Sequence, residues 1–275
     1  MSVVVPTRDR PDRLARCLAA LDRQTQPDLE IVVVDDASRD ADAVLAAVTA
    51  VSRARLVRGE GRGPAAARNA GWRAAYAPVV CFTDDDCEPV AGWAEALTAR
   101  VRAGHAAAAG PTRNGRPGNV LAAAAQAIAT HLAEATMDPA TGRMRFAPTS
   151  NLACTAEVLH RVPFDERYPL AAGEDRDWCA RLLAAGHDLV FEPGARVDHH
   201  QELSPSGFWR QQVRYGRGAF RFRSDHRTLT RPEPLGFYTG LLRRGFAEGP
   251  AAGLLVGVAQ VATAVGMAAE AVRRP

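Results

Sequence analysis

The chain has 275 residues, of which 47% are hydrophobic and 24% are charged, a balance typical of globular proteins with enough apolar material for a large core. A formal net charge of +3 is too small to indicate a nucleic-acid-binding protein. All strongly basic side chains are arginine, because the sequence contains no lysine, so mechanisms that need a lysine amine are excluded.

The first hundred residues alternate between short β-branched runs and helical patterns. Strands are predicted at residues 2–5, 30–34, 55–58 and 79–83. Helical patterns lie between them, and the first has an apolar face that consists of Leu14, Cys17, Leu18 and Leu21. This alternation predicts a doubly wound, mostly parallel α/β domain.

The first strand is predicted to stop at Pro6. Asp9 followed by Pro11 is typical of a helix start, with Asp9 as the cap and the proline near the first helical position. We therefore expect the first helix to begin directly after Asp9.

Three consecutive carboxylates, Asp84-Asp85-Asp86, follow the fourth strand. Adjacent like charges repel, so the triplet needs water or a cation, and Mg²⁺ and Mn²⁺ prefer such oxygen ligands. An isolated triplet would be a solvated acidic turn. A second acidic strand end, Asp35-Asp36, and the segment Pro6-Thr7-Arg8 favour a site instead, because the carboxyl ends of parallel strands meet at one edge.

Two other nucleotide-associated patterns are disfavoured. The glycines at positions 59, 61 and 63 lack the spacing of a dinucleotide fingerprint after a first strand. A phosphorylated-aspartate receiver domain would place aspartates at strand ends, but it would also require a lysine.

Four segments in this order resemble family 2 glycosyltransferases, which are inverting enzymes with the nucleotide-diphospho-sugar transferase fold. These segments are residues 3–10 (VVVPTRDR), 32–38 (VVVDDAS), 67–71 (ARNAG) and 82–86 (FTDDD). The resemblance implies that Asp86 holds Mn²⁺ or Mg²⁺ between the donor phosphates. It also implies a nucleotide-sugar-binding set that consists of Pro6, Thr7, Arg8, Asp35, Asp36, Arg68, Asp84 and Asp85. Neutralising a diphosphate leaving group without lysine would then require the metal and arginine.

The second half of the chain continues the resemblance. Asp175 of the Glu174-Asp175 pair matches the family's general base, which removes the proton of the attacking acceptor hydroxyl. Without the resemblance, these acids would be residues that favour a helix N-terminus through its dipole. Asn151 and Trp178 join Glu174 on the expected acceptor side, and we expect residues 111–119 to form a polar, mobile loop.

Adjacent histidines on a strand point to opposite faces, so only one of His199 and His200 is expected to reach the site. Related enzymes often place a histidine here as a metal ligand, and alignment through Val197 favours His199.

From residue 204 onward, arginines alternate with aromatic residues. Gln211-x-x-Arg214-Tyr215 is similar to the Gln-x-x-Arg-Trp acceptor motif of processive polysaccharide synthases, with tyrosine in place of tryptophan. The chain has no room for the membrane channel of those synthases, so we expect single-sugar transfer, with this segment near lipid headgroups or as a lid over the diphosphate.

Residues 249–269 carry no charge, and arginine pairs at 243–244 and 273–274 flank them. The length is sufficient for a bilayer span, but glycine and alanine dominate. We therefore favour a membrane-surface helix or a helix packed on the domain, and the flanking arginines set no orientation.

Together these features predict a catalytic domain at residues 1–203, with a nucleotide-sugar-binding half at 1–100 and an acceptor-binding half at 101–203. Residues 204–275 are expected to form a helical C-terminal region. The expected reaction moves one sugar, from a UDP-sugar in most related enzymes, to a hydroxyl acceptor that is lipid-linked or a small molecule. Such acceptors occur in cell-envelope glycan, glycolipid and secondary-metabolite synthesis, and no nucleic-acid partner is expected.

Two alternatives remain open. A non-catalytic relative would bind nucleotide or a partner without turnover. A sugar nucleotidyltransferase would share the fold, but it would require a glycine-rich loop after the first strand and a nearby lysine.

The five cysteines are scattered without paired metal-ligand spacing: Cys17, Cys81, Cys87, Cys154 and Cys179. We expect reduced core residues of a cytoplasmic protein, peripheral to or anchored at the inner face of the cell membrane. The first strand follows Met1 at once, so no signal peptide is expected.

Overall fold

The computed structural model describes residues 1–228 and 233–273, so the predicted flanking residue Arg274 lies outside the described part of the chain. The elements in chain order are β1 (Ser2–Thr7), α1 (Pro11–Asp22), β2 (Glu30–Asp35), α2 (Ala41–Thr49), β3 (Ala54–Arg58), α3 (Pro64–Ala74), β4 (Val79–Thr83), β5 (Cys87–Pro89), α4 (Trp93–Arg102), β6 (Ala107–Ala109), β7 (Thr112–Asn114), α5 (Val120–Ala135), β8 (Asn151–Thr155), α6 (Ala156–Arg161), α7 (Glu174–Ala184), β9 (Leu189–Phe191), β10 (Val197–His199), α8 (Pro205–Asp225), α9 (Leu235–Ala247) and α10 (Pro250–Arg273).

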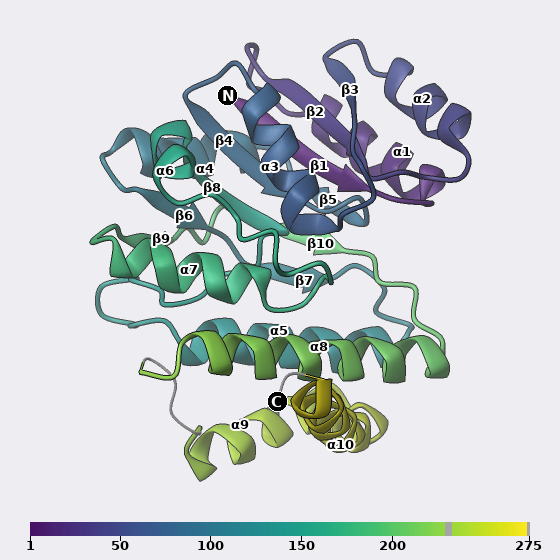
Figure 1. Cartoon of the computed structure of the whole chain (residues 1–275), viewed down its shortest axis with the longest axis vertical. Coiled ribbons are helices and arrows are strands. Elements are labelled where there is room, and N and C mark those ends of the chain that lie inside the picture. Colours follow the sequence, from purple (N-terminus) through teal and green to yellow (C-terminus); the bar gives the residue numbers. More distant parts are fainter. Residues whose placement is uncertain (229–232, 274–275) are drawn as a thin grey trace.

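A seven-stranded sheet in the order β3-β2-β1-β4-β8-β6-β9 forms the centre of the molecule (Figure 1). β8 runs antiparallel to both of its neighbours, β4 and β6, and the remaining pairs are parallel. The predicted mostly parallel, doubly wound α/β fold is therefore confirmed. Because β1, β2 and β4 are parallel, the segments that follow them leave the sheet at the same edge.

Side-chain alternation along the central strands divides the core into two layers. Val3 and Val5 of β1 pack into the layer that contains α1, α2 and α4, while Val4 packs into the opposite layer with α3, α6 and α7. Val32 and Val33 of β2 divide in the same way. Both faces of the sheet are thus covered by helices, which explains why these strands are continuous apolar runs.

A smaller sheet in the order β5-β10-β7 lies beside the carboxyl edge of the large sheet. β10 pairs antiparallel with β5 and parallel with β7. This sheet brings residues 87–89 and 197–199 together although they are far apart in the sequence. β7 also corrects the expectation for residues 111–119, because part of that segment is a paired strand rather than a mobile loop.

The C-terminal helices form a further layer below the two sheets in Figure 1, where α8 lies alongside α5. Phe208 of α8, Leu241 of α9 and Val256 of α10 share an apolar cluster with Leu121 and Ala124 of α5. The helical character predicted for residues 204–275 is confirmed for their described part. The predicted boundary at residue 204 stays a prediction, and α5 on its far side packs with the C-terminal helices.

One helix in the described part of the chain, α10, is long and apolar enough to cross a membrane, judged by length and composition. One third of its most apolar window is buried within the protein. Core helices of soluble proteins pass the same test, so the helix is weak evidence for a span. The Gly-rich face explains the burial: a Cβ atom on Gly266 would lie 2.0 Å from the Val213 carbonyl oxygen of α8.

Two predicted boundaries in the first segment were wrong. β1 continues through Pro6 to Thr7, because pairing with β4 ends at Val4 and the missing proline N–H therefore costs no ladder bond there. The first helix is capped by Arg10 rather than Asp9. Asp9 has a φ of 55°, and its carboxylate accepts a hydrogen bond from the Arg39 backbone N–H at 2.8 Å.

All five cysteines are free and buried, as predicted.

Candidate active site

The strand ends open into one cavity of about 1410 Å³. Its N-terminal wall consists of lining residues between positions 6 and 86, and its C-terminal wall of lining residues between positions 112 and 267. Most of the residues predicted from the sequence line this cavity: Pro6, Thr7, Arg8, Asp36, Arg68, Asp84, Asp85, Asp86, Glu174, Asp175, His199, Gln211 and Arg214.

Each carboxylate of the Asp84–Asp86 triplet has its own partners. Asp84 pairs with the Arg68 guanidinium at 2.9 Å. Asp85 accepts hydrogen bonds from the Thr7 hydroxyl at 2.8 Å and from Arg10 Nη1 at 3.1 Å. Asp86 lies 3.1 Å from His199 Nε2. The repulsion expected from three adjacent carboxylates is thus offset by cations and donors around each of them, and Arg10 contacts both Asp85 and Asp86.

These environments separate the pKa values of neighbouring carboxylates. Burial raises the pKa of Asp85 to about 6, although the charge of Arg10 opposes the shift. Burial also disfavours ionised Asp86, but His199, Arg10 and Arg13 outweigh it and lower the pKa of Asp86 to about 2. Asp86 is therefore the more firmly ionised carboxylate, as a cation ligand must be.

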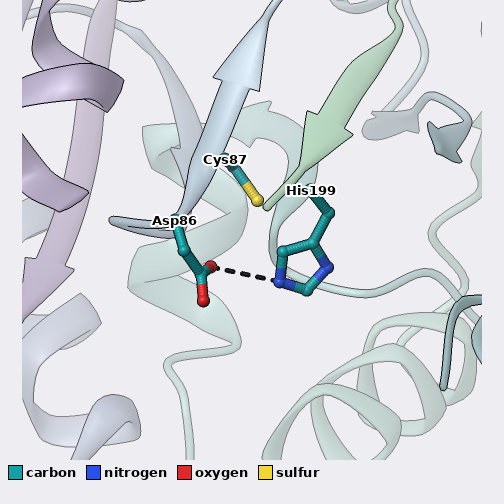
Figure 2. Close-up of side chains that lie close together, drawn as sticks. All are labelled: Asp86, Cys87 and His199. Atoms are coloured by element: carbon teal, nitrogen blue, oxygen red, sulfur yellow. Dashed lines mark ion pairs between the residues drawn. The ribbon is translucent and has the colours of Figure 1, made fainter. Parts of the chain in front are cut away.

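Asp86 and His199 form the candidate metal site, and Figure 2 shows their side chains pointing toward each other. Ligand atoms of Asp86, Cys87 and His199 all lie within 4.8 Å of one another. The register causes this proximity, because Cys87 of β5 lies opposite His199 of β10 and Asp86 directly precedes β5.

The donor chemistry fits Mn²⁺ or Mg²⁺ with two protein ligands. Carboxylate oxygen and imidazole nitrogen are both suitable for Mn²⁺, and open positions would remain for phosphate oxygens and water. Cys87 is a poor third ligand because burial raises the pKa of its thiol well above the ordinary value, and a hard cation does not favour sulfur.

The two histidines diverge as the strand geometry predicts. His199 faces Asp86, whereas His200 Nε2 lies 3.4 Å from Glu88. The backbone N–H of His200 donates to the Asp86 carbonyl at 2.7 Å, which holds the two segments together. His199 is therefore the histidine that meets the acidic triplet, and its role as a ligand stays a prediction.

Asp35 and Asp36, at the end of β2, differ in their access to the cavity. Asp36 accepts a hydrogen bond from the Gly63 N–H at 2.9 Å, faces Arg8 at 3.9 Å and lines the cavity. Asp35 is 1% exposed, does not line the cavity and is bonded to Arg58 and the Ser38 N–H. The structure therefore does not bring Asp35 to the cavity with the other predicted residues, and Asp35 stabilises the turn after β2.

Arg68 connects the two walls of the cavity. Its guanidinium donates to Asp84 at 2.9 Å and to Glu174 at 3.0 Å, and the arginine is only 4% exposed. α3 carries Arg68 close to the sheet because Gly71 has no side chain: a Cβ there would lie 2.3 Å from Val4. Burial and the neighbouring Asp175 raise the pKa of Glu174 to about 7 despite the Arg68 charge.

Asp175 lies at the start of α7, beside Glu174, and lines the same cavity. Its carboxylate accepts a hydrogen bond from the Arg176 backbone N–H at 2.8 Å. Burial raises the pKa of Asp175 above the ordinary aspartate value, with Arg176 and Arg68 opposing the shift. A carboxylate that is partly desolvated and faces a cavity is a stronger proton acceptor than one in water.

Gln211 and Arg214 of α8 both line the cavity. Gln211 donates to the Gln201 side chain at 3.0 Å, and Gln201 in turn lies 3.2 Å from His199 Nδ1. Gln201 therefore links α8 to the candidate metal histidine.

Asn151 and Trp178, which were expected on the acceptor side, do not line the cavity. The Asn151 amide donates to the Pro111 and Ala195 carbonyls and accepts from the Trp93 indole, so its hydrogen-bonding capacity is used inside the protein. Trp178 is fully buried and donates to the Val162 carbonyl. Both residues support the fold.

Several cavity residues escaped the sequence analysis. Arg10 and Arg13 reach Asp86 at 3.5 Å from the first turn of α1 and its cap. The sequence feature that could have identified Arg10 and Arg13 as site residues is their position directly after the end of the first strand. Arg176 and Arg223 also line the cavity, but no sequence spacing relates them, because they meet only when α7 and α8 pack together.

Comparison with known proteins gives concordant results. The sequence model of glycosyl transferase family 2 matches residues 2–167. The chain is 28% identical over 241 residues to pre-mycofactocin glycosyltransferase of Mycobacterium tuberculosis, covering 84% of this chain and 49% of that protein. It is 27% identical over 225 residues to glycosyltransferase AglE of Haloferax volcanii, covering 79% of this chain and 72% of that protein. The chain thus spans about half the length of the mycobacterial relative.

Solved structures share the fold. Mannosyltransferase PcManGT from Pyrobaculum calidifontis, in complex with GDP-Man and Mn²⁺, superposes with a TM-score of 0.63 at 20% identity and covers 99% of this chain and 78% of its own. Residues 1–349 of TarS from S. aureus give a TM-score of 0.55 at 17% identity, with coverage of 99% of this chain and 90% of that fragment. The family match over more than half of the chain shows that this protein belongs to glycosyl transferase family 2.

Proposed function

We propose that this glycosyltransferase is metal-dependent and inverting, and that it moves a single sugar from a nucleoside-diphosphate sugar to a hydroxyl acceptor. One observation carries the proposal: the Asp86–His199 pair and the Asp175 carboxylate line one cavity, although they come from three distant segments. A cation site for the donor phosphates and a base for the acceptor are the two groups that the reaction requires.

The N-terminal wall is the proposed donor site. The loop after β1 and Asp36 provide polar groups for the nucleobase, and Asp84 and Asp85 provide acceptors for ribose hydroxyls. Arg68 is held by two carboxylates, so it is oriented before a ligand binds. A UDP-sugar is the favoured donor by family resemblance, whereas the structural neighbour PcManGT was solved with GDP-Man.

Asp86 and His199 would hold Mn²⁺ or Mg²⁺, and the donor set fits either ion as described above. Such an ion supplies positive charge that neutralises the diphosphate leaving group. Arg10 and Arg13, which pair with Asp86 at 3.5 Å, contribute further positive charge at the same edge.

Asp175 is the proposed general base. Its side chain lies in the cavity at the N-terminus of α7, where it would take the proton of the acceptor hydroxyl as that oxygen attacks the anomeric carbon. Attack from the face opposite the leaving diphosphate inverts the anomeric configuration. General-base assistance of this kind contributes about 10²–10⁴-fold in rate.

The C-terminal wall is the proposed acceptor side, where Glu174, Gln211 and Arg214 would contact the acceptor. The exposed apolar residues of α9 and α10, including Phe246, Leu254 and Val261, support contact with the inner face of the cell membrane. A lipid-linked acceptor of cell-envelope synthesis is consistent with that placement.

A thermal-shift titration with UDP, GDP and dTDP, each with and without Mn²⁺, tests the donor site. A ligand at about 100 times its Kd stabilises the folded state by about 2.7 kcal/mol. For a protein of this size, that corresponds to a rise in Tm of roughly 5–10 °C. We expect one nucleotide to give a Mn²⁺-dependent shift that Asp86→Ala abolishes.

The matched control is Asp42→Ala, which removes an exposed carboxylate of α2 away from the cavity and should leave the shift unchanged. A metal-independent shift of equal size, or an equal shift in Asp86→Ala, would contradict the proposed metal site.

A further inference from the structure

The arginines that line the cavity fall into two groups. Those of the N-terminal wall all have carboxylate partners within 4.0 Å: Arg8 with Asp36, Arg10 with Asp85, Arg13 with Asp86, Arg16 with Glu88 and Arg68 with Asp84. Their charge is therefore already offset in the protein.

The arginines of the C-terminal wall are different. Arg176, Arg210, Arg214 and Arg223 line the cavity, and within residues 1–228 and 233–273 none of them has a carboxylate at ion-pair distance. Their contacts are apolar or weak. Arg176 lies 5.6 Å from the Phe146 ring centre, and Arg223 Nη1 lies 3.7 Å from the Met267 sulfur. The Nε atom of Arg214 is buried without a hydrogen-bond partner.

Arg176 and Arg223 line the same cavity, and the charge of Arg223 acts on Arg176. Burial lowers the pKa of the Arg176 guanidinium, the neighbouring charge of Arg223 lowers it further, and Asp175 and Glu233 oppose the shift. Within the described residues neither guanidinium has a carboxylate at ion-pair distance, so both keep paired N–H donors for an oxyanion such as phosphate or carboxylate.

The part of the cavity wall formed by α5, α9 and α10 is mostly apolar, and Arg223 contacts it at Met267. Its apolar residues include Ile128 and Leu132 of α5, Phe237 and Leu241 of α9, and Ala264 and Met267 of α10. A ligand that reached the arginines from this side would place an anionic group on them and an apolar body along the three helices.

We propose that Arg176 and Arg223, supported by Arg210 and Arg214, bind a phosphate-class oxyanion of the acceptor, whose apolar part lies along α5, α9 and α10. The acceptor is then an anionic amphiphile. This assignment rests on the proposed transfer reaction, in which Asp175, the residue before Arg176, takes the acceptor proton. The donor phosphates have their own cations in Arg10, Arg68 and the Asp86–His199 site.

Calorimetric binding of four probes to the full chain, without metal or nucleotide, tests the assignment. Octyl phosphate carries both features, glycerol phosphate and inorganic phosphate carry only the oxyanion, and octyl glucoside carries only the apolar chain. We expect octyl phosphate to bind most tightly. Affinity of octyl glucoside equal to that of octyl phosphate would overturn the oxyanion site, and equal affinity of inorganic phosphate would overturn the apolar part.

The variant Arg176→Gln/Arg223→Gln is expected to lose at least roughly tenfold in octyl phosphate affinity, because two charge-assisted contacts are removed. Arg176→Lys/Arg223→Lys should retain part of it, since the charge remains. Arg102→Gln, at the exposed end of α4, removes an arginine away from the cavity and should bind like the wild type. Unchanged affinity in the double glutamine variant would overturn the proposal.

Metal-dependent nucleotide binding, measured on the same variants, separates this proposal from the proposed function. Retained nucleotide binding with lost octyl phosphate binding supports the acceptor assignment and shows that the variant is folded. If the wild type binds nucleotide with Mn²⁺ but not octyl phosphate, the oxyanion assignment fails and the proposed function stands.

Discussion

The two walls of the cavity differ in how their arginine side chains are paired with carboxylates. In the N-terminal wall, Arg68 bridges Asp84 and Glu174 and is almost completely buried. In the C-terminal wall, Arg223 is partly exposed and touches a thioether instead of a carboxylate. Arginine is therefore oriented in advance by carboxylates in the N-terminal wall, and Arg223 of the C-terminal wall has no carboxylate at ion-pair distance within the described residues.

The difference shows how one cavity can serve two substrates. A paired arginine is oriented in advance, but part of its charge is already offset. An unpaired arginine keeps its full charge for an incoming anion, which must then supply the missing partner. Substitutions should accordingly cost stability in the N-terminal wall and ligand affinity in the C-terminal wall.

The largest effect is expected at Asp175, where the two walls meet. Asp175→Asn should lower kcat by about 10²–10⁴-fold, because the amide cannot take the acceptor proton. Nucleotide binding with Mn²⁺ should persist, and the two measurements together isolate the chemical step. Asp42→Asn, an exposed substitution on α2, is the control. Loss of nucleotide binding in Asp175→Asn would instead place Asp175 in the donor site.

Substitution of one arginine from each wall tests the comparison directly. Arg68→Gln should lower the free energy of unfolding by about 3 kcal/mol, because it leaves the buried Glu174 carboxylate without its cation. Arg223→Gln should change it by no more than about 0.5 kcal/mol, since no ion pair is lost. Urea denaturation measures both values. Equal losses for the two variants would contradict the division between the walls.

A smaller effect is expected where α8 packs on the loop before Asp175. A Cβ on Gly218 would lie 2.4 Å from the Ala172 carbonyl oxygen, so Gly218→Ala should cost about 1–3 kcal/mol of stability and should lower kcat by displacing that loop. Gly257→Ala, in open space on α10, should stabilise the protein by roughly 0.5–1 kcal/mol through helix propensity. Thermal unfolding and kcat, measured on both variants, should show a loss of each in Gly218→Ala and a higher Tm in Gly257→Ala.

The smallest predicted effect is a shift in pH dependence. The pKa of Asp175 is raised, mainly by burial, so kcat should fall as the pH decreases through a value above that of an ordinary aspartate, about 3.9. The Arg176 charge favours ionised Asp175, and Arg176→Gln should therefore move this acid limb to higher pH. If the acid limb of the kcat–pH profile of Arg176→Gln stays at the same pH or moves to lower pH, a group other than Asp175 controls that limb.

The sequence predicted the fold and the N-terminal wall well because both depend on local patterns. The apolar strands 2–5, 30–34 and 79–83 and the acids after them follow from periodicity and from the geometry of parallel strands. Asp86 and Asp175 were identified by family resemblance, and the structure brings them to one cavity.

The C-terminal wall was harder to predict because its residues act through packing. Asn151 and Trp178 matched the family pattern, yet hydrogen bonds to Ala195 and Val162 commit them to the interior. Arg176 and Arg223 had no recognisable motif, because two helices must dock before they meet. Sequence patterns report periodicity and local motifs, but not which surfaces come together.

The five free, buried thiols can be used to measure how each core layer of the protein unfolds. Cys17, Cys81 and Cys87 lie in the core layer under α1 and α4, whereas Cys154 and Cys179 lie on the opposite side of the sheet. A thiol reagent reaches each one only when its layer unfolds, so the labelling rate at each cysteine measures the stability of that layer. Because no engineered probe is needed, the unmodified chain can report whether its two core layers separate together or one at a time.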